Sequence, residues 1–124
     1  MPRRRPEQEL QKVVLEHLAW RGTPGIFAFH YPAGGWRSPV EAAIFKSLGV
    51  VAGVPDVIVI HDGRCFALEL KTAHGRLTSI QIETQARMRA AGCVVATAVE
   101  IDAVLERLEQ WGLLRPDVSA RRAS

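Results

Sequence analysis

Cysteine is scarce in this sequence: its 124 residues include only Cys65 and Cys93. Neither residue belongs to a C-x-x-C motif or has the Cys/His spacing of a zinc site. Each lies within an apolar run that is typical of a strand. We therefore interpret both as buried, reduced thiols rather than as metal ligands.

Long apolar runs are also missing. None approaches the ~18 residues that a membrane-spanning helix needs. The first ten residues, MPRRRPEQEL, are basic and lack the apolar region of a signal peptide. We therefore expect a cytoplasmic protein with no membrane segment. With 48% hydrophobic and 23% charged residues, the composition fits one globular domain with a modest core.

The excess of positive charge is small and is concentrated near the ends of the chain. The net charge of +3 is compatible with a nucleic-acid partner but does not show one. Arginines cluster at residues 3–5 and again within residues 115–122. Each cluster is either a solvated tail or an arm that contacts phosphates. We expect a basic arm over residues 1–6, a folded domain over 7–114 and a basic tail over 115–124.

Hydrophobic periodicity and turn residues predict a series of helices and strands. Ser38 and Pro39 are typical of a helix start, and Gly92 is typical of a residue just after a helix end. Two adjacent strands joined by a tight turn, then a helix, then a strand, predict a mixed sheet whose last strand is parallel to its neighbour. The sequence therefore predicts a small α/β domain. The expected helices cover 7–21, 39–50, 79–91 and 100–111, and the expected strands cover 26–31, 57–60, 64–71 and 93–99.

Charged residues interrupt the predicted hairpin, GVPDVIVIHDGRCFALELK at 53–71. Asp62-Gly63 is typical of a two-residue turn, and this turn places Asp56 opposite Glu69. Directly opposed Cβ atoms lie about 4.5–5.5 Å apart, so the two carboxylates repel each other. A divalent cation between them reverses that interaction, and oxygen ligands favour Mg²⁺ or Mn²⁺.

Lys71 lies two residues after Glu69 and therefore on the same strand face. Beside a metal, its ammonium can orient a water or stabilise an anionic transition state. These three residues predict metal-assisted hydrolysis of a phosphodiester. The alternative is a solvated strand face that carries an ordinary cross-strand charge pair.

Five blocks of the sequence resemble the virus-type replication-repair nuclease (VRR-NUC) family, a branch of the PD-(D/E)XK nuclease superfamily. They are EQELQ at 7–11, HYPAGGWRS at 30–38, EAAIFKSLGVVAGVPD at 41–56, ALELKTAHGRLTSIQ at 67–81 and AAG at 90–92. The resemblance implies a small restriction-endonuclease-like α/β fold, in which helices flank a central mixed sheet. It also implies Asp56, Glu69 and Lys71 as catalytic residues, a divalent metal and a nucleic-acid substrate.

The resemblance implies further site residues. Glu7, followed by Gln11, matches a family glutamate that would complete the metal shell, with Glu9 as the fallback. The alternative for Glu7 is a favourable charge in the first turn of a helix. Gln81 matches a family glutamine in the catalytic site, and Thr78-x-x-Gln81 is also a capping box.

Nucleic-acid contacts are the third implication of the resemblance. Gly34 and Gly35 permit close approach of a backbone, and the basic residues can meet phosphates. His30 is either a functional residue or a satisfied core histidine. The expected contact residues are His30, Gly34, Gly35, Arg37, Lys46 and Arg76.

The expected function is therefore a metal-dependent endonuclease that hydrolyses phosphodiester bonds in DNA and selects branched, Holliday-junction-like structures. Its cofactor would be Mg²⁺ or Mn²⁺, with no small-molecule cofactor. Because cutting two strands needs two sites, we expect a homodimer. The resemblance also implies a phage-infected or bacterial cell as the setting. A non-cleaving nucleic-acid-binding module and a protein-interaction domain are the alternatives.

Overall fold

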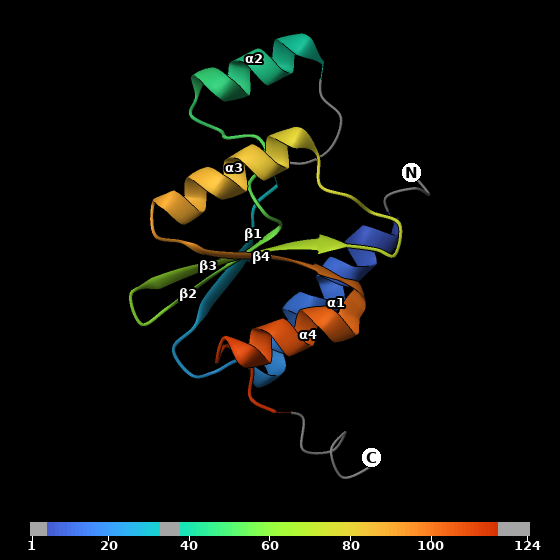
Figure 1. Ribbon diagram of the computed structural model, residues 1–124, viewed down its shortest axis with the longest axis vertical. Coiled ribbons are helices and arrows are strands. Elements are labelled where there is room, and N and C mark those ends of the chain that lie inside the picture. The colour runs from blue at the N-terminus through green and yellow to red at the C-terminus, as the bar shows by residue number, and fades with distance from the viewer. Residues whose placement is uncertain (1–4, 33–37, 117–124) are drawn as a thin grey trace.

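The computed structural model describes residues 5–32 and 38–116. Every helix and strand expected from the sequence is present and in the expected order (Figure 1). Their bounds differ from the expected ones by at most a few residues, as is usual for element ends. The elements are α1 (Arg5–Arg21), β1 (Phe27–His30), α2 (Pro39–Ser47), β2 (Val57–His61), β3 (Arg64–Lys71), α3 (Ser79–Ala90), β4 (Val94–Val99) and α4 (Glu100–Gln110).

The four strands form one mixed sheet in the order β1-β2-β3-β4. β1 pairs with β2 and β2 with β3 in antiparallel fashion, whereas β3 and β4 are parallel. The parallel pair is joined through α3, as the order hairpin, helix, strand requires. The expected fold class, a small α/β domain with helices flanking a mixed sheet, is confirmed.

The hairpin turn is the two-residue turn that Asp62-Gly63 predicts. Both residues have positive φ, 51° for Asp62 and 76° for Gly63, which is the signature of a type I′ turn. The pairing runs from His61↔Arg64 at the turn to Val57↔Leu68 at the far end. The predicted register is therefore confirmed, and its next step outward from the turn brings Asp56 opposite Glu69.

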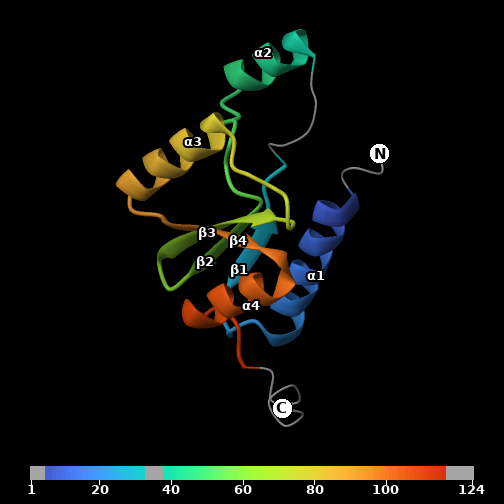
Figure 2. The same ribbon diagram turned by 45° about the vertical axis from the view of Figure 1, so that its right-hand side comes forward.

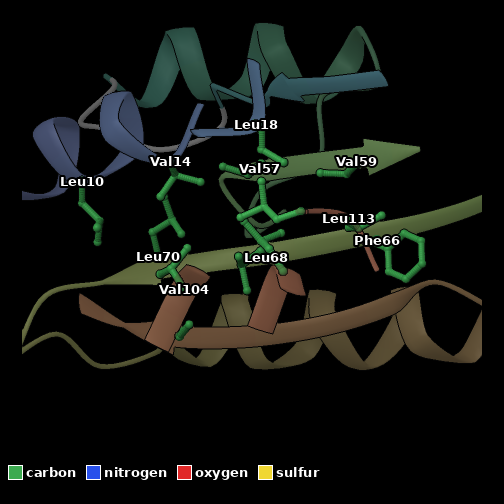
Figure 3. Packing of buried hydrophobic residues seen from close by; sticks show 13 residues of the cluster. Leu10, Val14, Leu18, Val57, Val59, Phe66, Leu68, Leu70, Val104 and Leu113 are labelled. Atoms are coloured by element: carbon green, nitrogen blue, oxygen red, sulfur yellow. The ribbon is translucent and has the colours of Figure 1, made fainter. Parts of the chain in front are cut away.

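The two faces of the sheet carry different helices (Figures 1 and 2). α1 and α4 cover one face, and α3 lies over the other, with α2 beyond it. The apolar core fills the α1/α4 side, where Val14, Leu68 and Val104 are almost fully buried (Figure 3). Side chains of β3 alternate between the two faces of the sheet. Phe66, Leu68 and Leu70 therefore point into the apolar core, whereas Glu69 points to the opposite face.

The start of α3 is fixed against the loop that precedes β2. Thr78 caps the helix, and its side chain and that of Gln81 form the capping box that the sequence predicts. The Thr84 hydroxyl donates to the carbonyl of Ala52 at 2.7 Å. Gly53 approaches so closely that a Cβ there would lie 2.7 Å from the carbonyl oxygen of Ile80. These contacts hold α3 over the end of the sheet that carries Asp56 and Glu69.

α2 is the most isolated element (Figures 1 and 2). Ser38 caps it, and Pro39 is its first residue, as the sequence predicts. Glu41 completes a capping box with Ser38. No residue of α2 is buried, so its stability depends on these caps and on contacts of its half-buried side. Among the described helices, none is long and apolar enough to cross a membrane.

The close approach of Gly53 to α3 can be tested with a matched pair of glycine variants. Gly53 and Gly49 both have positive φ, 83° and 92°, but a Cβ on Gly49 meets nothing within 4 Å. Gly53→Ala should therefore destabilise the protein more than Gly49→Ala, by about 1–3 kcal/mol for the added overlap. Urea unfolding of both variants measures this difference, and equal losses would show that the contact does not fix α3.

Candidate active site

Asp56, Glu69 and Lys71 lie close together at the end of the sheet where β2 begins and β3 ends. Asp56 directly precedes β2, and Glu69 and Lys71 lie in the last three residues of β3. Glu69 and Lys71 are buried on the sheet face that α3 covers, with only 3% and 7% of their surface exposed. Asp56 is half-buried. The charged residues that the sequence places in a core hairpin are thus within a polar layer and not on a solvated face.

The position of Asp56 is fixed by hydrogen bonds at both its side chain and its backbone. Its Oδ2 accepts the backbone N–H of Leu70 at 2.9 Å, which ties the carboxylate to β3. Its carbonyl oxygen accepts the N–H of Tyr31 at 3.0 Å and the Nδ1–H of His30 at 2.8 Å. Hydrogen bonds from β3 and from the end of β1 therefore orient this residue. Such preorganisation is what a metal-binding or catalytic carboxylate needs.

Glu69 has one partnered and one unpartnered oxygen. Its Oε2 lies 3.2 Å from Nε2 of Gln81, which donates to it, and 3.5 Å from Nζ of Lys71. Its Oε1 is buried and forms no hydrogen bond within the described part of the chain. A buried carboxylate oxygen without a partner costs about 1–3 kcal/mol or more, so this atom calls for a further ligand.

The environment of Glu69 disfavours its charged form. The pKa of this carboxyl is raised from 4.5 to about 8, first by burial and then by the nearby carboxylate of Asp56, while Lys71 acts in the opposite direction. Without a cation, Glu69 therefore keeps its proton at neutral pH. Strongly shifted pKa values with a specific charged neighbour are typical of functional sites.

The buried stem of Lys71 is fixed by the turn that follows β3. The N–H of Gly75 donates to the carbonyl of Thr72 at 2.8 Å, which closes this turn. A Cβ on Gly75 would lie 3.0 Å from Cδ of Lys71, so the backbone packs tightly on the lysine stem. The ammonium is consequently held beside Glu69.

A small cavity of about 190 Å³ opens beside these carboxylates. Asp56, Glu69 and Gln81 line it together with Gly53, Thr78 and Ile80. Two carboxylates that face a cavity, one of them with an unpartnered buried oxygen, fit a Mg²⁺ or Mn²⁺ ion. Mg²⁺ is commonly bound through one or two carboxylates while it keeps several waters.

Of the residues expected from the sequence, the structure brings Gln81 into the site. Its Nε2 donates to Glu69 and its Oε1 accepts the N–H of Thr78, so one side chain contacts the carboxylate and caps α3 at the same time. His30 contacts Asp56 through the backbone carbonyl, which is a satisfied and positioning role. Lys46 and Arg76 are exposed, and no contact joins either to the carboxylates. Gly34, Gly35 and Arg37 lie outside the described residues.

Glu7 is not gathered with the two carboxylates. It is exposed in the first turn of α1, and Glu9 forms an ion pair with Lys12 at 3.8 Å. Within residues 5–32 and 38–116, no group of three or more His, Cys, Asp or Glu side chains is placed to hold a metal ion. The start of α1 does face the side of the sheet where β3 ends (Figures 1 and 2). A metal-shell role for Glu7 therefore stays a prediction.

A buried polar layer beneath α3 extends the site and was not predicted. Thr97 of β4 pairs with Glu69 in the parallel ladder, and its hydroxyl accepts from Nε2 of Gln85 at 3.4 Å. Gln85 is only 1% exposed. In the sequence, this layer could have been inferred only from Thr97, a polar residue within the apolar run of β4.

Comparison with solved structures finds three similar chains. One, named "VRR_NUC domain protein", superposes with a TM-score of 0.70 and 28% sequence identity over 90% of this chain and 92% of its own. A second, named "VRR_NUC domain", has a TM-score of 0.53 and 19% identity, over 84% of this chain and 94% of its own, and supports the fold alone. Neither protein-family models nor curated proteins gave a match.

The raised pKa of Glu69 predicts how stability depends on pH when no metal is bound. Between pH 4.5 and about 8 the folded state keeps a proton that the unfolded state releases, so stability falls as the pH rises. The contribution is fully present below pH 4.5 and is lost by about pH 8. Each unit of pKa shift corresponds to about 1.4 kcal/mol.

Urea unfolding in the presence of a chelator, over this pH range, measures the effect. Glu69→Gln has a similar shape and no titrating carboxyl, so it should lack this part of the decline. The difference between the two curves therefore reports the effect of removing the Glu69 carboxyl. Parallel stability curves for wild type and variant would contradict the raised pKa.

Proposed function

We propose that this chain, whose structural likeness supports its assignment to the VRR-NUC domain family, is a metal-dependent endonuclease that hydrolyses phosphodiester bonds in DNA. The observation that carries the proposal is the pair Asp56 and Glu69 at the open end of the hairpin, away from its turn. Within the described residues Glu69 has a buried oxygen without a partner, and Lys71 lies beside it. Two preorganised carboxylates and a lysine match the needs of phosphodiester hydrolysis.

Asp56 and Glu69 would hold the divalent cation, Mg²⁺ or Mn²⁺. When bound, such an ion supplies Lewis-acid polarisation of the phosphoryl oxygen and lowers the pKa of a bound water. The protein supplies the fixed geometry. The hydrogen bond from the Leu70 N–H orients Asp56, and the hydrogen bond from Gln81 orients Glu69.

Lys71 and Gln81 both lie next to Oε2 of Glu69. The Lys71 ammonium, 3.5 Å from Glu69, is placed to orient the attacking water or to stabilise negative charge that develops on the phosphate. Gln81 holds the Glu69 oxygen that faces α3. Removing Lys71 should therefore affect the chemical step, whereas removing Gln81 should loosen the metal ligand.

For the substrate, we propose branched DNA of the Holliday-junction type. The family resemblance and the net charge of +3 support a nucleic acid. One cavity with one carboxylate pair cuts one strand at a time. Cutting two strands of a junction therefore requires two copies of the chain.

The homodimer that this implies is supported by an exposed apolar stripe along α2 and its C-cap residue Leu48. Val40, Ile44 and Leu48 recur every fourth residue and are 70%, 52% and 74% exposed. Sedimentation velocity should show a dimer that Ile44→Glu converts to monomer. A wild-type protein that remains monomeric with and without DNA would contradict this proposal.

Cleavage assays test the proposed activity. Wild type should cut at least one of a panel of four-way, flap, linear and single-stranded DNA substrates in Mg²⁺ or Mn²⁺. Asp56→Ala and Lys71→Ala should each slow cutting by roughly 10²–10³-fold, because each removes a group that stabilises the transition state. Asp102→Ala and Lys12→Ala, exposed on the helices of the opposite face, are the matched controls.

The outcomes separate the alternatives. Equal activity in wild type, Asp56→Ala and Lys71→Ala would overturn the assignment of the site. Wild-type protein that binds DNA and cuts none of the panel would favour a non-cleaving binding module. Protein that neither binds nor cuts nucleic acid would favour an interaction domain.

A further inference from the structure

A groove between α2 and α3 adjoins the candidate active site. It has a volume of about 670 Å³. We name it the α2–α3 groove. Lys46 of α2 and Arg87 of α3 line it, together with Glu83 and mainly apolar residues that include Phe45 and Ile80. The sequence singles out Lys46 as a basic contact residue, whereas it gives no motif that involves Arg87.

The α2–α3 groove adjoins the cavity at the carboxylates. Ala52 and Ile80 line both hollows, so they form the boundary between them. This boundary is well fixed, because the Thr84 hydroxyl donates to the Ala52 carbonyl at 2.7 Å. A polymer chain bound at the carboxylates would therefore have the groove directly beside it.

The positive charges of the groove are not used by the protein itself. Within the described residues, neither the Arg87 guanidinium nor the Lys46 ammonium forms a hydrogen bond or ion pair, and both side chains are exposed. Arg89, on the same helix, instead donates to Gln85 and to the carbonyl of Val95. Arg21 is likewise paired with Glu109, at 3.0 Å. Arg87 and Lys46 thus differ from the arginines that hold the fold together.

The ordinary explanation for Arg87 is a helical charge pair with Glu83, four residues earlier. Such a pair contributes about 0.2–0.5 kcal/mol to a helix. In the part of the chain that the structure describes, however, Glu83 and Arg87 form no ion pair within 4.0 Å. Both line the groove instead. Their charges should therefore act on whatever occupies it, Arg87 attracting a phosphate and Glu83 repelling it.

We propose that the α2–α3 groove binds the sugar-phosphate backbone of the DNA strand that leaves the candidate active site, with Arg87 and Lys46 each contacting a phosphate. The inference rests on the proposed nuclease function and extends it to a substrate path. Arg87 is suited to this role because a guanidinium can bind two oxygens of one phosphate. The apolar residues of the groove would contact the sugars. A strand bound here would be positioned relative to Asp56 and Glu69 without recognition of its sequence.

Salt-dependent binding tests the proposal. The affinity of wild type for a fluorescein-labelled four-way junction, and for a linear duplex, is measured over a range of NaCl concentrations with a chelator present, so that no strand is cut. Arg87→Ala and Lys46→Ala should each weaken binding. Each should also reduce the slope of log K against log[salt] by about 0.9 for the phosphate contact that is lost.

Two further variants sharpen the test. Arg87→Lys keeps the charge and should restore most of the slope, and Glu83→Gln should tighten binding because it removes a repelling charge. Arg107→Ala on α4, which covers the opposite face of the sheet, is the matched control and should bind as wild type does. Because these side chains are exposed, all variants should keep the wild-type melting temperature.

Different results would contradict the groove proposal and the proposed nuclease function. If wild type binds DNA and the Arg87→Ala and Lys46→Ala variants keep both its affinity and its salt slope, the groove is not the path and the proposed active site stands. If wild type binds no DNA at any salt concentration, both proposals are overturned.

Discussion

Two carboxylates placed opposite each other at the end of a hairpin are the constraint on which the rest of this structure depends. The type I′ turn at Asp62-Gly63 fixes the register, and the register brings Asp56 across from Glu69. In a sheet, like charges at this separation are destabilising. Burial adds to the cost, and the pKa of Glu69 rises to about 8. At neutral pH the raised pKa therefore favours a proton or a cation at Glu69.

Much of the surrounding structure serves to hold this pair in place. The apolar face of β3 packs with α1 and α4, which anchors the strand whose other face carries Glu69 and Lys71 (Figure 3). α3 is fixed over the site by its capping box and by the hydrogen bond from Thr84 to Ala52. Gln81 belongs to both the cap and the site. Stability and the proposed function are therefore coupled through the first turn of α3.

The sequence predicted the hairpin because its information is local. A two-residue turn and strict side-chain alternation are enough to place Asp56, Glu69 and Lys71 relative to one another. The contacts made by residues distant in sequence could not be predicted in this way. Gln85 under α3 and Thr97 on β4 meet only because the crossover brings their elements together. The groove that contains Arg87 likewise depends on where α2 and α3 lie relative to each other, which neither helix specifies alone.

The central claim is that Asp56 and Glu69 together bind a divalent cation in place of the proton on Glu69. Calorimetric titration with Mn²⁺ near pH 7, in buffers that differ in ionisation enthalpy, tests this claim most directly. Wild type should release about one proton for each Mn²⁺ bound, because Glu69 must ionise to become a ligand. Glu69→Gln should show no such release. Mn²⁺ binding by wild type without proton release, or equal binding by Asp56→Ala, would contradict the account.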